Sequence, residues 1–363
     1  MPAAETLSLR QLNRATLARQ MLLARAQMTP SETVEQVLGL QAQLARPPIV
    51  GLWSRLAGVD RREVVDQLMQ RRLVRAPAMR ATLHVMTAVD YLRFRRTLQP
   101  CLDRAISVLK DRAADLELER LVELGRAFFA TPQTFDAFRD ALARRHPTAD
   151  VRAMAYAVRT RLPVVQVPIH AGWGFPAQAD FITADAWLGK SPADGDYADE
   201  LVIRYLQAFG PATVADVQAW SGLAGLKRAI DSLGSRLREF GGPGRATLFD
   251  LPDAPRPDGT MPAPVRFLPE WDNVIVSRAD ERLVPREYRA KVFRPGLRVL
   301  PTVLVDGFVA GLWKVQRRGR AATLVVEPFA PLTKRARAEV EQEADTLIRF
   351  VEPDAARSTV LVR

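Results

Sequence analysis

The sequence predicts an α+β fold that is mainly helical, and three observations lead to this prediction. Three successive segments each place several short helices before a pair of short β-prone runs. From residue 266 the pattern changes to strands that alternate apolar and polar residues, and a last helical pattern covers residues 333–350. Short helices followed by a β-hairpin is the order of a winged helix. We therefore expect three tandem winged-helix modules, at 1–87, 88–190 and 191–252, and a β-rich C-terminal part at 253–363.

The first segment carries clear helix-start signals. Thr29 to Glu32 combines an N-cap threonine, a proline at the first helical position and a glutamate three residues after the cap. Asp60 to Glu63 is a second capping pattern. Expected helices cover residues 7–23, 29–43, 49–56 and 60–69, and two β-prone runs about a proline turn follow over 73–86.

The end of the second expected helix, within residues 37–48, contains two glutamines. Its apolar stripe leads to position 41, which is Gln41, and a polar group directed at a core needs a partner or a role. Gln43 lies roughly 200° further around an ideal helix, so the two side chains converge only if the helix unwinds before Pro47 and Pro48. Two explanations stay open: the amides satisfy carbonyls at the helix end, or they act in catalysis.

The second and third segments repeat the order without a strict sequence repeat. The second segment is expected to have helices at 91–110, 116–129, 134–138 and 150–162, then a strand at 164–169 and a wing tip at 172–175. The third segment is expected to have helices at 200–209, 213–222 and 224–233, then wing strands at 237–240 and 246–251.

The C-terminal part begins with a linker rich in Pro, Asp and Gly at 253–265. Expected strands are at 267–269, 274–276, 299–303, 308–315 and 322–326, and the last helix turns Val340, Ala344, Leu347 and Ile348 inward. A hairpin tip at 314–321 carries four positive charges and no acid, namely Lys314, Arg317, Arg318 and Arg320. It could be a loop that enters a DNA groove, or a solvated tip.

Composition points to an anionic partner. The 363 residues have a net charge of +11, with 52 basic residues against 41 acidic ones. A GC-rich genome explains the preference for Arg over Lys but not the excess of bases, which favours nucleic acid as the partner. The single cysteine excludes a disulfide framework, and we expect neither a signal peptide nor a membrane span, so we expect a cytoplasmic protein.

Common catalytic signatures are missing from the sequence. The three histidines are far apart, with no metal-ligand spacing, and there is no P-loop, dinucleotide fingerprint or nucleophile elbow. His84 shares a strand face with Thr82 and is either a half-buried strand histidine or a site residue. Asp272 and Asn273 are either catalytic polar groups at a strand end or residues of an Asx turn.

Four stretches together resemble a known family. They are Leu40 to Gln43 followed by Pro47, Pro48 and Trp53; Met79 to His84; Phe267 to Asn273; and Val305 to Trp313. In this order the chain is similar to the AlkZ-like winged-helix DNA glycosylases of the azinomycin-resistance type, over residues 7–350. The resemblance implies three winged helices that form a C-shaped, basic DNA channel, closed by the β-rich part.

The resemblance also implies which residues are catalytic. The family signature is Gln–apolar–Gln in one branch and Gln–apolar–Asp in another, and Gln41-Ala42-Gln43 matches the first. That branch is associated with removing bulky N7-alkylated purines and with unhooking interstrand cross-links made by natural-product genotoxins. The expected roles are therefore DNA repair or self-resistance, and the catalytic residues are Gln41 and Gln43.

Amides suit this chemistry. A purine alkylated at N7 is cationic and leaves without a general acid, so the enzyme needs only to place a water at C1′ and stabilise an oxocarbenium-like sugar. A carbonyl oxygen can do both. Because the first lysine of the chain is Lys110, we expect a monofunctional glycosylase without a Schiff base or a lyase step. No cofactor and no metal are expected.

The expected partner is double-stranded DNA that carries alkylated purines or cross-links, bound by a monomer associated with the nucleoid. Residues expected to contact DNA are Lys314, Arg317, Arg318, Arg320, Arg46 and Arg80. Residues expected to support the glutamines are Trp53, Thr82, His84, Asp272 and Asn273. Two alternatives remain: a winged-helix transcription regulator without catalysis, and a protein that shields damage without cutting.

Overall fold

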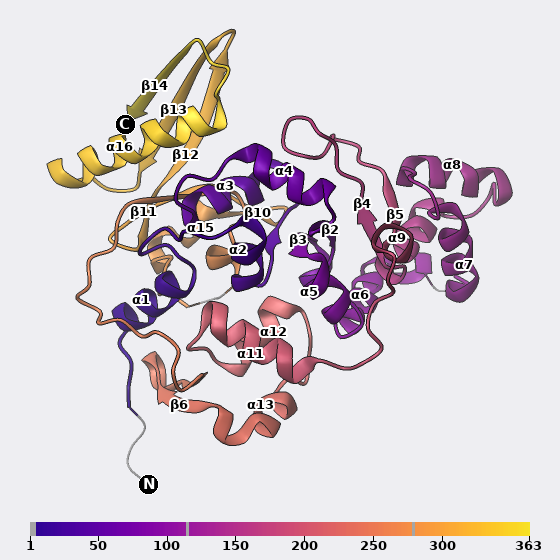
Figure 1. Cartoon of the computed structure of the whole chain (residues 1–363). Helices are drawn as coiled ribbons and strands as arrows, with labels where there is room; N and C mark the ends of the chain where they lie inside the picture. Colours follow the sequence, from indigo (N-terminus) through magenta and orange to yellow (C-terminus); the bar gives the residue numbers. More distant parts are fainter. Residues whose placement is uncertain (1–4, 114–115, 278–279) are drawn as a thin grey trace.

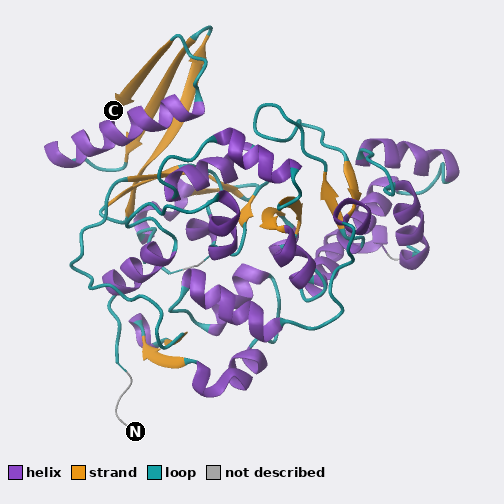
Figure 2. Ribbon diagram, viewed as in Figure 1, coloured by secondary structure: helices purple, strands orange, loops and turns teal. Residues whose placement is uncertain are grey.

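The first segment packs four helices around a small antiparallel sheet (Figures 1 and 2). The computed structural model describes residues 5–113, 116–277 and 280–363. The helices are α1 (Leu9–Arg19), α2 (Pro30–Gln36), α3 (Arg46–Arg55) and α4 (Arg61–Met69). The strands are β1 (Leu40–Gln41), β2 (Leu73–Pro77) and β3 (Leu83–Thr87), in the order β1-β3-β2, with a 3₁₀ turn at Met79–Ala81 between β2 and β3. The predicted hairpin is confirmed, as is the Thr29 capping box.

The predicted helix over residues 29–43 is wrong in its second half. Helix α2 ends at Gln36, and the chain turns through Leu38 (φ 57°) and Gly39 (φ 89°) into strand β1. A Cβ at Gly39 would lie 3.1 Å from Met86 Cγ, so both the φ angle and the space require glycine there. Leu38 and Leu40 are both buried. Apolar spacing therefore could not distinguish a continued helix from a turn and a strand.

The two prolines begin a helix and do not stop one. Pro47 and Pro48 lie in the first turn of α3, which starts at Arg46. The first turn of a helix needs no backbone N–H, so proline is tolerated there.

The second segment forms a lobe with its own core. Its helices are α5 (Ala88–Phe94), α6 (Gln99–Ile106), α7 (Leu118–Phe128), α8 (Phe135–Arg145), α9 (Val151–Arg161) and α10 (Ala184–Leu188), with a 3₁₀ stretch at Ser107–Ala113. Strands β4 (Val164–Gln166) and β5 (Phe181–Thr183) form its hairpin. The single helix expected over 91–110 is broken after Phe94, since Pro100 begins a new helix in its first turn. Helices α7 to α9 enclose a cluster around Phe129, Phe138 and Val158.

The third segment matches its prediction closely. Its elements are α11 (Ala198–Phe209), α12 (Val214–Ser221), α13 (Lys227–Leu233), β6 (Arg238–Gly241) and β7 (Thr247–Asp250), with 3₁₀ turns at Gly234–Arg236 and Pro243–Arg245. Thr213 forms a capping box with Asp216. The core of this segment is continuous with that of the first, because Tyr205 and Trp220 belong to the same cluster as Leu38.

The C-terminal part is built on a five-stranded sheet of order β14-β13-β12-β11-β8. Its elements are β8 (Arg266–Leu268), α14 (Asn273–Val276), a 3₁₀ turn (Arg286–Tyr288), α15 (Arg289–Val292), β9 (Phe293–Arg294), β10 (Arg298–Val299), β11 (Thr302–Val305), β12 (Phe308–Arg318), β13 (Ala321–Pro328), α16 (Lys334–Val351) and β14 (Arg357–Val362). Helix α16 lies against one face of β12–β14, and this unit projects from the body of the protein (Figure 1).

Two outcomes in the C-terminal part differ from the prediction. The strand expected at 274–276 is helix α14, whose first turn is capped by Asp272. Strand β14 was not predicted, and it pairs in parallel with β13 after the α16 crossover. The expected inward face of α16 is confirmed, since Val340, Ala344, Leu347 and Ile348 are buried. In the described part of the chain, no helix has the length and apolar content that crossing a membrane requires.

Candidate active site

The side-chain oxygens of Gln41 and Gln43 each accept one hydrogen bond from the protein. Gln41, on β1 and 8% exposed, accepts at Oε1 from Arg80 Nη2 at 2.7 Å. Gln43, which is exposed, accepts at Oε1 from the backbone N–H of Leu83 at 3.2 Å. Within the described residues, neither Nε2 amide donates a hydrogen bond to a carbonyl at a helix end. The helix-end explanation of the two glutamines is therefore wrong.

Asn273 fixes the backbone at the first glutamine. Its Oδ1 accepts from the backbone N–H of Gln41 at 3.1 Å, and its Nδ2 donates to the carbonyl of Gly39. Asn273 is the first residue of α14, so the C-terminal part holds strand β1 directly. The structure thus places Asn273 against the backbone of the motif, and its supporting role stays a prediction.

Asp272 acts one step further away, through a buried ion pair. Its carboxylate accepts from Arg55 of α3 at 2.8 and 2.9 Å, and both side chains have no exposed surface. Arg55 also donates to Gln20 Oε1 at 3.1 Å. Asp272 caps α14 through the backbone N–H of Val274 as well, so it fixes the position of Asn273.

Arg75 also holds the backbone of the motif, and the sequence did not single it out. Its Nε donates to the carbonyl of Ala42 at 2.8 Å and its Nη2 to the carbonyl of Gln43 at 3.1 Å. Burial lowers the pKa of Arg75 to about 10, and the charge of Arg159 contributes. The only sequence signal was an arginine inside the otherwise apolar run of β2, Leu73–Pro77.

Arg80, expected to contact DNA, is engaged by the protein. Besides Gln41 it donates to the backbone carbonyl of Trp220 at 2.5 Å, and burial lowers its pKa to about 10. Its backbone is in the left-handed region, with φ 54°. These contacts place Arg80 against Gln41 and orient its amide, while a contact of Arg80 with DNA stays a prediction.

His84 is fully buried, not half-buried, and lies opposite Gln41 in the sheet. Burial, and secondarily the charge of Arg80, lower the pKa of His84 to about 3, so the ring is neutral at pH 7. A neutral ring with its proton on Nδ1 donates to the Thr82 carbonyl at 3.1 Å, which leaves Nε2 to accept from Arg80 at 3.5 Å. Thr82 itself donates through Oγ1 to the carbonyl of Met79 at 3.1 Å and stabilises the turn.

Arg46 lies where three parts of the chain meet. Its guanidinium is 5.8 Å from the ring of Trp173, in the β4–β5 loop, and 6.0 Å from the ring of Trp313, on β12. It begins helix α3, three residues after Gln43. The candidate site is thus flanked by the lobe of the second segment and by the base of the C-terminal hairpin.

The four cations of the C-terminal hairpin fall into two pairs. Lys314 and Arg317 form ion pairs with Glu327 at 2.8 Å and Glu352 at 2.9 Å. Arg318 and Arg320 are exposed and form no ion pair with the described residues. In the sequence the four charges look equivalent, because Glu327 and Glu352 lie outside the hairpin tip, on β13 and at the end of α16.

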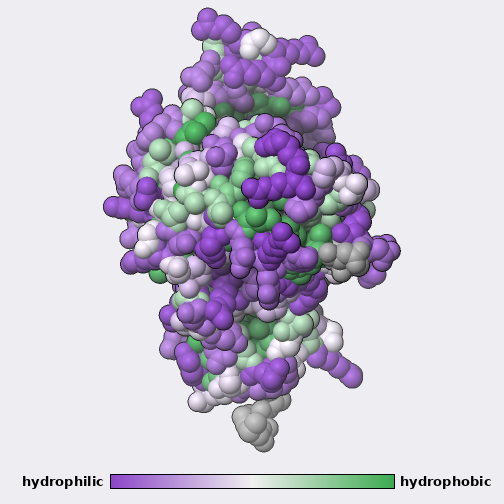
Figure 3. All heavy atoms as spheres, turned by 90° about the vertical axis from the view of Figure 1, so that its right-hand side faces the viewer, coloured by the Kyte–Doolittle hydropathy of each residue, from purple (hydrophilic) through white to green (hydrophobic). Residues whose placement is uncertain are grey.

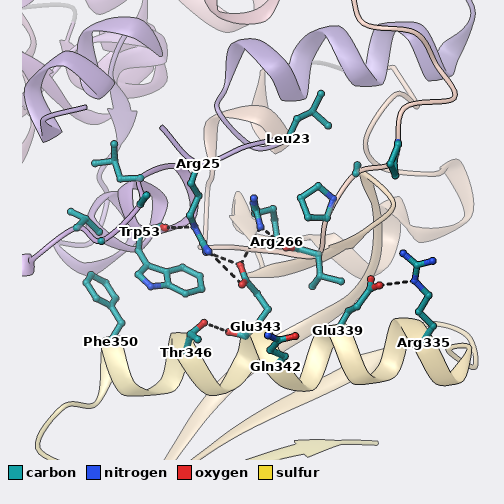
Figure 4. Close-up of a pocket in the computed structure, with 18 residues that line it drawn as sticks. Leu23, Arg25, Trp53, Arg266, Arg335, Glu339, Gln342, Glu343, Thr346 and Phe350 are labelled. Carbon is teal, nitrogen blue, oxygen red and sulfur yellow. Dashed lines mark hydrogen bonds and ion pairs between the residues drawn. The ribbon is translucent and has the colours of Figure 1, made fainter. Parts of the chain in front are cut away.

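Trp53 faces a different cavity. This cavity, of about 830 Å³, lies between the first segment and α16 (Figure 4). There the ring of Trp53 stacks on Phe350 with centroids 6.1 Å apart, and Arg25 lies 4.5 Å from the Trp53 ring centroid and pairs with Glu343 at 2.6 Å. Neither glutamine of the motif lines this cavity. Its two carboxylates, Glu339 and Glu343, are paired with arginines that line the same cavity.

A smaller pocket of about 360 Å³ includes Gln43. It lies between the first hairpin and the lobe of the second segment, and Arg75 also lines it. No group of three or more His, Cys, Asp or Glu side chains in the described residues could hold a metal ion.

The fold and the motif together define a class of protein, the AlkZ-like DNA glycosylases. The chain belongs to this family, since the model of the family "DNA glycosylase AlkZ-like" matches residues 34–350. This confirms the resemblance seen in the sequence.

Two comparisons with individual proteins agree with the family. The chain is 27% identical to an interstrand DNA cross-link repair glycosylase of Streptomyces sahachiroi over an alignment of 380 positions. The alignment covers 94% of this chain and 96% of the relative. The solved structure of Streptomyces sahachiroi DNA glycosylase AlkZ matches with a TM-score of 0.78 and 23% identity, over 99% of this chain and 100% of the other. The structural match covers the C-terminal part as well as the helical segments, so it shows the fold of the whole chain.

Proposed function

We propose that this DNA glycosylase hydrolyses the N-glycosidic bond of bulky N7-alkylated purines in duplex DNA, and that it unhooks interstrand cross-links. The related protein from Streptomyces sahachiroi is named for cross-link repair, and its length matches this chain. The observation that carries the proposal is the fixed pair of carbonyl acceptors, Gln41 and Gln43. A bulky or cross-linked lesion cannot be flipped fully into a tight pocket, which fits a site at the surface.

The catalytic roles follow from the lone pairs of the two amides. Each Oε1 has two lone pairs. One lone pair of Gln41 accepts from Arg80, and one of Gln43 accepts from the N–H of Leu83. The second lone pair can accept from the attacking water and face the positive charge that develops at C1′. The alkylated base leaves without protonation, so the neutral His84 is not needed as an acid. Among the described residues no lysine is hydrogen-bonded to either glutamine, which supports a monofunctional reaction.

The proposed path of the DNA runs past the motif between two projections. We infer that the three segments are winged-helix modules and that the duplex lies in a channel between the C-terminal hairpin and the α7–α9 lobe. Arg46, with Trp173 and Trp313, would form the floor beside the motif. The face that carries the α7–α9 lobe is mostly hydrophilic, with apolar side chains gathered near its middle (Figure 3).

The test is excision by the glutamine variants. Gln41→Ala and Gln43→Ala are expected to lower the excision rate of an N7-alkylguanine by about 10²-fold or more each, with unchanged thermal unfolding. Excision is measured by alkaline cleavage of the abasic product, and borohydride is expected to trap no enzyme–DNA adduct.

Gln36→Ala, an exposed glutamine at the end of α2, is the matched control and is expected to behave as the wild type. Full activity in both motif variants contradicts the proposed roles. Sequence-selective binding of intact DNA without any abasic product would instead support a regulator.

A further inference from the structure

The pocket of about 360 Å³ beside Gln43 combines two arginines that have no acidic partner. Arg75 reaches it from β2 and Arg159 from α9. The one carboxylate among the described residues that line the pocket is Asp136, which pairs with Arg139 at 2.6 Å. The pocket therefore holds an uncompensated positive charge.

Arg159 is the unengaged cation of the pair. It makes no hydrogen bond or ion pair with the described residues, and its guanidinium lies 5.6 Å from the ring centroid of Phe181. Burial lowers the pKa of Arg159, and the charge of Arg159 in turn helps to lower the pKa of Arg75. Two like charges brought together in partly desolvated surroundings destabilise the free protein. An anion bound between them removes that repulsion.

The pocket also contains a polar side chain with an unsatisfied oxygen. Gln166 of β4 is 7% exposed, and its Oε1 is buried without a hydrogen-bond partner in the described structure. Rotation of the amide would present the Nε2 donor in its place. Two guanidinium groups and an amide can together donate to several oxygens of one anion.

We propose that this pocket binds a backbone phosphate of the DNA next to the nucleotide under attack, held by Arg75 and Arg159 with Gln166. Guanidinium groups match phosphate oxygens in bidentate geometry, and phosphate contacts set the register of a protein on DNA. Arg75 also binds the carbonyls of Ala42 and Gln43, so the phosphate and the motif share one side chain. Phosphate binding would then place C1′ relative to the two carbonyl oxygens. This inference rests on the proposed function only for the identity of the lesion.

The variant of choice is Arg159→Gln, because Arg75 also supports the motif and Arg159 does not. A synthetic duplex carries one N7-alkylguanine, and a neutral methylphosphonate replaces one phosphate at a time on either strand near the lesion. With the wild type, one substituted position is expected to lower kcat/KM by about ten- to a hundredfold, as expected for loss of a charged hydrogen bond. On the alkylated duplex without any methylphosphonate, Arg159→Gln is expected to show the same loss of kcat/KM. A methylphosphonate at the sensitive position is expected to lower the kcat/KM of this variant no further.

The controls separate charge from structure. Arg159→Lys keeps the charge and is expected to recover part of the loss and the sensitivity to the methylphosphonate. Arg152→Gln removes an exposed charge from the same helix and is expected to keep the full methylphosphonate effect. Wild-type behaviour of Arg159→Gln, or additive effects of the variant and of every methylphosphonate, overturns the phosphate site.

Binding to the same duplexes is measured separately from excision. If the wild type binds but excises nothing, the proposed reaction fails, while the loss of affinity at one methylphosphonate still supports the phosphate site. If the wild type excises the lesion and no single methylphosphonate lowers kcat/KM or affinity, the proposed phosphate site is wrong and the proposed reaction stands. The strand that carries the sensitive phosphate identifies which backbone occupies the pocket.

Discussion

Arg80 is the residue that sets the orientation of Gln41. It donates to Gln41 Oε1 and to the carbonyl of Trp220, so one side chain connects the motif to the third segment. Its left-handed backbone, with φ 54°, costs of order 1–3 kcal/mol for a residue other than glycine. The surrounding contacts hold Arg80 in this conformation and thereby keep the Gln41 carbonyl in one place.

His84 makes stability depend on pH. The pKa of His84 is lowered from 6.5 to about 3 by burial and by Arg80. Below pH 6.5 the histidine of the unfolded chain takes up a proton that the folded protein does not. The contribution of His84 to the free energy of unfolding is therefore fully present above pH 6.5 and is lost as the pH falls towards 3. The slope is about 1.4 kcal/mol per pH unit. In urea unfolding between pH 7 and pH 4, the difference in unfolding free energy between wild type and His84→Gln is expected to narrow.

His170→Gln is the control for this measurement. The side chain of His170 is 66% exposed, so its replacement removes a histidine without disturbing a buried site. A constant difference between wild type and His84→Gln over the whole range would show that the ring is not held neutral.

Among the elements, α14 connects the C-terminal part to the motif, although it has only four residues. Its cap, Asp272, is paired with Arg55 where neither side chain is exposed. Asp272→Ala leaves the guanidinium buried without its partner and is expected to lower the free energy of unfolding by about 3–5 kcal/mol. Chemical denaturation measures this loss.

The control uses a pair at the surface. Glu339→Ala breaks an exposed i,i+4 pair with Arg335 on α16 and is expected to change stability by about 0.5 kcal/mol or less. A loss of similar size in both variants would mean that the Arg55–Asp272 pair is not effectively buried.

Local signals predicted the elements that depend on local chemistry. The capping patterns at Thr29 and Asp60 each mark a helix start in the structure. Strands β1 and β14 were missed because each exists only through pairing with a distant strand, β3 for Gln41 and β13 for the C-terminus. Strand β1 has two residues and strand β14 has six, and segments this short carry no periodicity strong enough to predict such pairing.

The same distinction applies to the site. The pattern of two glutamines and the family resemblance single out Gln41 and Gln43. Arg75 and Arg159 could not be found in this way, because packing of β2 against the second segment brings together residues that are far apart in the chain. A buried arginine in an apolar run is a usable signal only once the neighbouring carbonyls are known.

For the whole molecule, the net charge of +11 says less than the way in which charges are paired. Many arginines of this chain are neutralised by acids from distant segments, such as Arg19 by Asp250 and Arg204 by Asp90. DNA affinity should depend on the cations that have no such partner. The C-terminal hairpin allows a direct comparison, because Lys314 and Arg317 are paired with acids whereas Arg318 and Arg320 form no ion pair with described residues.

Salt dependence measures this difference. Each phosphate neutralised by a free cation contributes about 0.9 to the slope of log Kd against log salt concentration. The double variant Arg318→Gln/Arg320→Gln is therefore expected to reduce the slope for an undamaged duplex by about two if both arginines contact phosphates. Lys314→Gln/Arg317→Gln removes the same formal charge, but it leaves Glu352 without Arg317 and Glu327 with only Arg363, at 3.5 Å. The direct phosphate contribution of this pair is therefore smaller, and the two acids repel DNA. This double variant is expected to weaken binding with a smaller change in slope, and equal slope changes in the two double variants would contradict the idea that pairing within the fold determines which cations bind DNA.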